Sequence, residues 1–355
     1  MSRHGRPVII VTACLLLSAC GGDTSEPSDR FGGMVFDTVR VIGSLDGDDR
    51  EVFGRITGVD VSEQGEIAIL DVQLPKVTVF GPDGEFAASL TAHGEGPGEL
   101  NQPWSLAWIG DGELLVADRG NARLSRFVLD GPDLQYAGSI PMEFPMEHLC
   151  TIGEDVFVAA YREEGMIHRF DWEIEDRESF GAVPDIASVE GMEGMFRDLA
   201  RRQWTVGRLM CEESADQVLE VGVLNGNVRL FTGDGETVWQ DRLEDVHMME
   251  PVVENGSFSG RPDEVTGAHV AQSTFLWDRE HVLVQYERRF PEDAGDQSEP
   301  ELDSRLIHLE TGTEEARTDA LPRFVGRSGD QFLKVRNEPY PRLLILERSS
   351  SDGEG

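Results

Sequence analysis

Polar side chains that could do chemistry gather in the stretch VADRGNARLSRF, which begins at Val116. Asp118, Asn121 and Arg123 place a carboxylate, an amide and a guanidinium close together. Such a set could bind a ligand, or it could stabilise a turn. The turn is physically reasonable, because Gly120 can adopt a positive φ without steric cost and Asn121 can hydrogen-bond the turn backbone. A carboxylate beside a guanidinium can also hold two strands together.

The loop HGEGPGEL, which begins at His93, is a second polar segment. It is not a phosphate loop, since a Walker motif needs Lys and Ser or Thr after its last glycine. Glu95 and Glu99 would also repel phosphate. We interpret the loop as a tight crossover between repeats, with a ligand-facing rim loop as the alternative. In the latter case His93, Glu95, Glu99 and the following Trp104 are the expected contact residues.

Signatures of hydrolytic enzymes are missing from the sequence. In GSFSG, Ser259 stands fourth rather than third, so the nucleophile-elbow spacing is not met. No HExxH motif occurs. The histidines are scattered along the chain, and we expect surface or strand positions rather than metal ligands for His93, His148, His168, His247, His269, His281 and His308.

An internal repeat predicts the fold. The segment that begins at Val59 aligns with the segment that begins at Leu106, with Asp71 on Asp118 and an offset of 47 residues. Each copy consists of short alternating strands separated by Gly and Asp turns. Such spacing indicates an all-β array, and a period of roughly 40–50 residues is typical of propeller blades.

The segment GELNQPWSLAWIGDGELLVADRGNARLSRF, followed by VLDG, resembles an NHL repeat, the blade of six-bladed NHL-type propellers. The match is close over this blade, partial over residues 53–86 and only architectural elsewhere. In that family the Asp-x-x-Asn-x-Arg pattern is structural. The resemblance therefore implies that Asp118, Asn121 and Arg123 form a blade turn and not a catalytic centre. The first copy departs from the pattern, with Leu74 and Pro75 in place of the Asn and Ala of the turn.

We predict an all-β, six-bladed propeller with one short helical insertion. Looser copies follow the first two, and the sixth, from Gly329, is one strand short. Residues 34–42 are expected to supply that strand, because pairing the start of the chain with the last blade removes free sheet edges. Residues 190–204 have apolar side chains at helical spacing and carry Arg197 and Arg201, which are further candidate ligand contacts.

Some six-bladed propellers hold a catalytic metal at the channel mouth, so we compared the expected inner strands. If Trp108 marks one inner strand, then Val61, Cys150, Cys211, Phe275 and Val325 match it. Four residues earlier stand Thr57, Trp104, Met146, Gly207, Ala271 and Leu321, none of which is a typical ligand for oxygen-preferring cations. Widening the comparison by one residue adds only Glu147 and Arg208 as charged groups, so we expect no metal or other cofactor.

The same alignment places Cys150 and Cys211 on neighbouring inner strands. A disulfide between blades three and four is therefore a possibility, provided that the two Cα atoms lie within about 7 Å. Two unpaired buried thiols are the alternative. An oxidising compartment would permit the bond.

The N-terminus indicates the location of the protein. Arg3 and Arg6 precede a short apolar run that suits a secretory signal. It ends in LSACG, which resembles the lipobox of bacterial lipoproteins and implies cleavage before Cys20 and lipidation of its thiol. Because Gly21 rather than Asp follows, we expect the outer membrane, facing the periplasm or the exterior. The predicted segments are a signal peptide (1–19), a flexible tether (20–32), the propeller (33–349) and a disordered tail (350–355).

The charge limits the partners. The chain has 355 residues and a formal net charge of −36, which disfavours binding to nucleic acids and anionic lipid surfaces. Two hypotheses remain. The first is a monomeric, lipid-anchored scaffold that binds a protein, peptide or glycan on the face that carries the blade crossovers. The alternative is a metal-dependent hydrolase or lyase, like the lactonase or amidating-lyase propellers, with its site in the central channel.

Overall fold

The computed structural model describes residues 30–349, except residues 111, 172–177, 185–191 and 291–300. Strands dominate the described residues and form four-stranded antiparallel units, numbered here one to six along the chain. Units one and two are linked through a single parallel bridge between Ser89 and Asp133. Near-continuous runs of apolar residues, such as residues 67–70, explain the strands, because both faces of each unit are covered by its neighbours.

In the first three units, the strands follow one another from the innermost strand to the outermost. Unit one consists of β2 (Ile56–Val61), β3 (Ile67–Asp71), β4 (Lys76–Phe80) and β5 (Phe86–Thr91). Unit two consists of β6 (Pro103–Ile109), β7 (Glu113–Asp118), β8 (Arg123–Asp130) and β9 (Asp133–Pro141). Unit three consists of β10 (His148–Ile152), β11 (Asp155–Arg162), β12 (Gly165–Asp171) and β13 (Glu178–Phe180).

The later units keep this order, except that unit six takes its outermost strand from the start of the chain. Unit four consists of β14 (Gly207–Glu212), β15 (Gln217–Gly222), β16 (Asn227–Thr232) and β17 (Thr237–Arg242), with the 3₁₀ turn η1 (Glu213–Ala215) after β14. Unit five consists of β20 (Ala268–Leu276), β21 (His281–Arg289), β22 (Leu302–His308) and β23 (Glu314–Thr318). Unit six consists of β24 (Gly326–Ser328), β25 (Gln331–Arg336), β26 (Arg342–Ser349) and β1 (Val35–Ile42).

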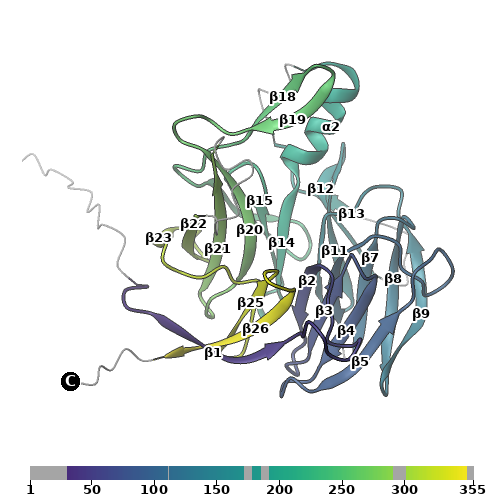
Figure 1. Cartoon of the computed structure of the whole chain (residues 1–355). Coiled ribbons are helices and arrows are strands. Elements are labelled where there is room, and N and C mark those ends of the chain that lie inside the picture. The colour runs from purple at the N-terminus through teal and green to yellow at the C-terminus, as the bar shows by residue number, and fades with distance from the viewer. Residues whose placement is uncertain (1–29, 111, 172–177, 185–191, 291–300, 350–355) are drawn as a thin grey trace, which may run out of the picture.

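The units close into a ring around a central axis (Figure 1). Their inner strands contact one another in the cyclic order β2, β6, β10, β14, β20, β24 and back to β2. The strand expected at residues 34–42 is β1, which pairs antiparallel with β26 from Val35 opposite Ser349 to Ile42 opposite Leu343. This pairing joins the start of the described chain to its end and leaves no free edge on β26.

The core lies between neighbouring units rather than inside one central layer. One apolar cluster, for example, packs Leu115 and Leu124 of unit two against Val156 and Val158 of unit three. Comparable clusters join units one and two, three and four, four and five, five and six, and six and one. Because each contact between units is filled, the ring is held together by the burial of apolar surface all around the axis.

The turn that contains Asp118 has structural contacts. Asp118 is fully buried and accepts hydrogen bonds from the backbone N–H of Asn101, at 2.9 Å, and from Asn121 Nδ2, at 2.6 Å. Asn121 Nδ2 also donates to Gly94 O, at 2.9 Å, and Arg123 donates to Gly96 O, at 2.7 Å. The three side chains thus fix the crossover loop that begins at His93, which supports the interpretation of a structural turn.

The expected role of Gly120 was wrong in detail. The positive φ of this turn, 47°, belongs to Ala122 and not to Gly120. Glycine is needed at position 120 for a steric reason, because the chain passes so close to Asn101 that a Cβ atom would collide with its carbonyl oxygen. The backbone N–H of Gly120 donates to this same oxygen at 2.7 Å.

Two insertions lie beside each other above the ring (Figure 1). The predicted helix is α2 (Gly194–Thr205), and the hairpin of β18 (Glu250–Glu254) and β19 (Ser257–Arg261) was not predicted. Trp204 of α2 is buried and packs edge-on against Phe258 of the hairpin, with ring centroids 5.3 Å apart. Within the described residues, no helix is long and apolar enough to span a membrane.

The segment expected to be a tether through residue 32 already contacts the ring at residues 30 and 31. Phe31 is 6% exposed and packs edge-on against Trp277, with ring centroids 5.6 Å apart. Arg30 pairs with Glu315 at 2.6 Å. An aromatic side chain can bury a large apolar surface, which explains why Phe31 packs against unit five. The predicted signal peptide, Cys20 and residues 350–355 lie outside the described residues.

Candidate functional site

A central cavity of about 1370 Å³ runs along the axis of the ring. Residues of all six inner strands line it. Because every unit has an even number of strands, the chain enters each inner strand from the same face. The first residues of β2, β6, β10 and β14 therefore lie at one mouth of the cavity, and the residues after these strands lie at the other.

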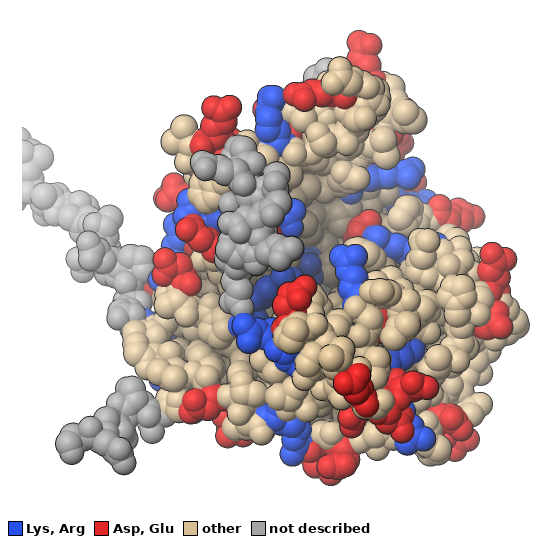
Figure 2. Space-filling model, viewed as in Figure 1, with Lys and Arg blue, Asp and Glu red and all other residues tan. Residues whose placement is uncertain are grey.

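Two arginines line the cavity at the first mouth. Arg208 is the second residue of β14, and Arg323 precedes β24. Arg208 Nε donates to Ala271 O at 3.0 Å. In the described part of the chain, no carboxylate lies within 4.0 Å of either guanidinium. Figure 2 shows Lys and Arg side chains in and around a hollow at the centre of this face of the acidic molecule. We call this end of the cavity the arginine mouth.

The two guanidinium groups affect each other. Burial lowers the pKa of Arg208 to about 10, and the positive charge of Arg323 contributes to the shift. Burial also lowers the pKa of Arg323, against the charge of Glu287. Glu287 itself pairs with Arg289 at 2.8 Å. Two arginines that remain charged without an ion-pair partner raise the local potential, so the arginine mouth is a site at which an anion would be stabilised.

His148 and Trp104 complete the arginine mouth. Burial, followed by the charges of Arg208 and Arg119, holds the pKa of His148 well below its usual value of 6.5. Its imidazole is therefore neutral at neutral pH and can donate or accept a hydrogen bond. The Arg119 guanidinium stacks 4.2 Å from the centre of the Trp104 ring and pairs with Glu147. Trp104 thus presents a flat, fixed surface beside the arginines.

Unpartnered hydroxyl groups line the same cavity. Thr57, the second residue of β2, has a buried Oγ1 atom without a hydrogen-bond partner among the described residues, and so has Thr274 of β20. A buried hydroxyl without a partner costs free energy, which a bound ligand or water would recover. Together with the arginines, these groups offer several hydrogen-bond donors to a ligand.

The opposite mouth is mainly acidic. Glu63, Glu154, Glu212 and Glu213 line it, together with Asp278, Arg279 and Arg327. Burial and then the negative charge of Glu63 raise the pKa of Glu213. The cavity therefore has a positive end and a predominantly negative end. This polarity favours an anionic group at the arginine mouth rather than deeper in the channel.

The sequence matches no protein-family model, and no curated protein matches it. Solved structures nevertheless share its architecture. The β-propeller domain of Cps50 (Swd1) from Myceliophteria thermophila aligns with a TM-score of 0.51 and 12% identity, over 89% of this chain and 100% of that one. A member of the duf4221 family from Bacteroides vulgatus aligns with a TM-score of 0.59 and 9% identity, over 90% and 99% of the two chains.

The chain has a β-propeller fold. The prediction of an all-β propeller is thereby confirmed. Identities this low concern the fold alone, so the function of the propeller depends on the residues of its own cavity.

The expected rim residues of the propeller do not form one site. Trp104 lines the cavity, whereas His93 and Glu95 are exposed on the crossover loop. Glu99 accepts a hydrogen bond from the backbone N–H of Gly96 at 2.7 Å and so stabilises that loop. Neither Arg197 nor Arg201 of α2 is among the residues that line the cavity.

Sequence comparison did not identify most of the arginine mouth. Arg208 was noted only as a charged neighbour of the expected mouth, and His148 stands two positions beyond the compared Met146. Arg323 likewise stands two positions beyond the compared Leu321, in the connection before β24. Polar residues that alternate at the starts of the inner strands could have identified these cavity-lining residues. Such a prediction requires strand boundaries that are known to within one residue.

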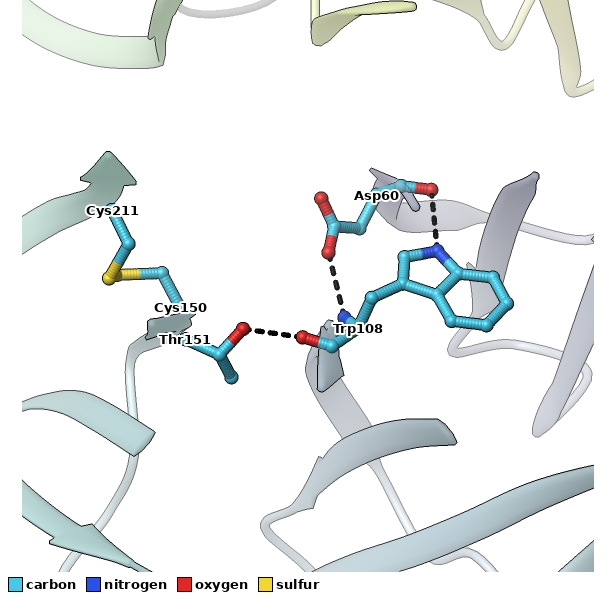
Figure 3. The surroundings of a disulfide bond; sticks show 5 residues. All are labelled: Asp60, Trp108, Cys150, Thr151 and Cys211. Atoms are coloured by element: carbon cyan, nitrogen blue, oxygen red, sulfur yellow. Dashed lines mark hydrogen bonds between the residues drawn. A yellow bond between two sulfur atoms is a disulfide. The ribbon is translucent and has the colours of Figure 1, made fainter. Parts of the chain in front are cut away.

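A chain of contacts joins four neighbouring inner strands of the propeller (Figure 3). Asp60 of β2 accepts a hydrogen bond from the backbone N–H of Trp108 of β6 at 2.9 Å. Thr151 of β10 donates to the carbonyl oxygen of Trp108 at 2.5 Å. Cys150 of β10 and Cys211 of β14 form a disulfide, with Cα atoms 5.6 Å apart. These contacts hold units one to four together at the cavity wall.

Replacing Asp60 by asparagine is expected to stabilise the propeller above pH 6. Burial raises the pKa of Asp60 from 3.8 to about 6, against hydrogen bonds from the backbone of Trp108 and Val61. The native state therefore holds the proton more tightly than the unfolded chain, and stability is lost as the pH rises from about 4 to about 6. Asp60→Asn removes that cost and keeps an acceptor for Trp108, so we expect a gain of roughly 1–2 kcal/mol at pH 7.5.

Urea unfolding at pH 4.5, 6.0 and 7.5 measures this effect. The difference between Asp60→Asn and the unchanged protein should grow with pH, whereas the exposed control Asp133→Asn should show no such trend. A difference that does not depend on pH would contradict the raised pKa of Asp60.

Proposed function

We propose that this protein is a lipid-anchored propeller of the cell envelope that binds a partner carrying a carboxylate or similar single anionic group. The partner is a protein, peptide or glycan, and its anionic group binds at the arginine mouth. The observation that carries this proposal is the pair Arg208 and Arg323, which line the cavity without a carboxylate partner among the described residues.

The overall charge narrows the ligand further. A net charge of −36 repels polyanions at a distance, whereas the arginine mouth attracts an anion that comes close. The two effects together favour a single anionic group on an otherwise neutral or basic partner. Trp104 offers a flat apolar surface beside this group, which suits a sugar ring or an apolar side chain.

Calorimetric titration with matched ligand pairs tests the proposal. Peptides with a free C-terminal carboxylate are compared with their amides, and uronic-acid oligosaccharides with neutral ones. We expect the carboxylate member of one pair to bind about 10-fold to 100-fold more tightly, since a charge-assisted hydrogen bond contributes roughly 1.5–3 kcal/mol. Equal binding within every pair, or no binding at all, would reject the site.

The anchor is the second part of the proposal. A lipid on Cys20 would attach the chain upstream of Arg30, which contacts unit five beyond the end of β20, on the face opposite the arginine mouth. The mouth would then point away from the membrane. We expect Cys20→Ser to abolish acylation, because serine lacks the thiol that would carry the lipid, and to weaken binding to the membrane fraction. Fractionation and mass spectrometry of the N-terminal peptide measure both effects.

The alternative of a metal-dependent hydrolase or lyase with its site in the channel stays a hypothesis. Turnover of a lactone panel by purified protein, lost when tightly bound metal is removed, would favour it over the binding scaffold.

A further inference from the structure

A cluster of two histidines and a glutamate lies on unit five, on the face opposite the arginine mouth. His281 is the first residue of β21, His308 is the last residue of β22, and Glu315 lies on β23. One potential ligand atom from each lies within 4.8 Å of the others. The sheet register creates this cluster, because His281 pairs with His308 across β21 and β22.

Both ring nitrogens of His281 have charged neighbours. Nδ1 lies 2.7 Å from Asp278 Oδ1, and Nε2 lies 2.9 Å from Nη1 of Arg30 and 3.0 Å from Glu315 Oε2. A carboxylate on one ring nitrogen and a positive group beside the other is the usual arrangement around a metal-binding histidine.

Arg30 occupies the position of a cation in this cluster. His281 Nε2 and Glu315 Oε2 lie only 3.0 Å apart, and the Arg30 guanidinium contacts both. A metal ion bound to these two atoms would take the position of the guanidinium. The arginine side chain is 42% exposed, so it can leave the cluster without opening the core.

The contacts of Arg30 with His281 and Glu315 do not involve the third member of the cluster, His308. Its ring stands edge-on to that of His281, with centroids 5.3 Å apart. The Nδ1 atom of His308 is buried and has no hydrogen-bond partner among the described residues. The cluster therefore offers more ligand atoms than one guanidinium uses.

We propose that His281, His308 and Glu315 bind a divalent transition-metal ion of the zinc class in place of Arg30. Two imidazole nitrogens and one carboxylate oxygen are a ligand set that Zn²⁺ accepts, whereas Ca²⁺ and Mg²⁺ prefer oxygen ligands alone. Asp278 orients the His281 ring through its contact with Nδ1. Metal binding competes with the contact that fixes Arg30, and so it acts on the segment that leads to the expected anchor.

Calorimetric titration of the purified, chelator-treated protein with Zn²⁺ tests this site. We expect one ion per chain, and Arg30→Ala should bind it at least about 10-fold more tightly because the competing cation is gone. In the Arg30→Ala background, His281→Ala and Glu315→Gln should each weaken binding by about 100-fold, and Asp278→Asn by roughly 10-fold. Thermal unfolding without metal shows whether each variant is folded.

His93→Ala is the matched control, since His93 is exposed on the other face and should leave Zn²⁺ binding unchanged. The proposal is overturned if Arg30→Ala binds no Zn²⁺, or if folded Glu315→Gln binds it as tightly as Arg30→Ala alone. The cluster and the arginine mouth lie on opposite faces, so the two tests are independent. A negative Zn²⁺ titration would not contradict ligand binding at the arginine mouth, and negative ligand titrations would not contradict the metal site.

Discussion

Replacing Arg208 and Arg323 together by alanine should weaken binding of the carboxylate ligand by at least about 100-fold. Each guanidinium is expected to form a charge-assisted hydrogen bond with the ligand, which contributes roughly 1.5–3 kcal/mol, and a factor of ten corresponds to about 1.4 kcal/mol. The single variants should each lose about 10-fold. Arg208→Lys should bind with intermediate strength, because it keeps the charge and loses the planar donor geometry.

Stability measurements separate binding from a structural role. Arg208 is partly buried without a carboxylate partner among the described residues, so its charge costs desolvation energy in the free protein. We therefore expect Arg208→Leu to be as stable as the unchanged protein or more stable, although it binds poorly. Arg261→Ala is the control, because Arg261 is exposed on β19 and pairs with Glu250 on the surface. Unchanged ligand affinity in the double variant would reject the arginine mouth as the site.

Removal of the disulfide with Cys150→Ser and Cys211→Ser should lower the free energy of unfolding by about 4 kcal/mol. The two cysteines are separated by 61 residues, and a crosslink over such a loop restricts the unfolded chain by this amount in the loop-entropy treatment. The bond also joins the inner strands of units three and four, so its loss should loosen the cavity wall. Urea unfolding of both proteins at pH 7.5 measures the difference.

Reduction provides an independent check on this expectation. Under a thiol reductant, the unchanged protein should unfold at the urea concentration at which the double serine variant unfolds, and the variant should not respond to the reductant. Equal stability of the oxidised protein and the variant would mean that the crosslink contributes nothing to the fold.

The motif around Asp118 shows how local and tertiary information divide. Its Asp, Gly, Asn and Arg indicated a polar turn, and the turn formed. Its partners, however, lie in the loop before β6, and Asn121 and Arg123 donate to the carbonyl oxygens of Gly94 and Gly96. The same holds for Asp71, which accepts backbone hydrogen bonds from Gly54, at 2.5 Å, and Arg55, at 2.9 Å. Residue types predict such a turn, but not which loop it fixes.

The repeated β architecture and the N-terminal strand beside β26 could be predicted from the amino-acid sequence. Alternating apolar residues and turn residues act over a few positions, so they can be read directly from the chain. Which side chains meet, in contrast, depends on how the units pack in three dimensions. Arg208 lies on unit four and Arg323 in the connection before unit six, and His281, His308 and Glu315 come from three strands of unit five. Ring closure and strand register bring these groups together, and both depend on contacts between residues that are far apart in the chain.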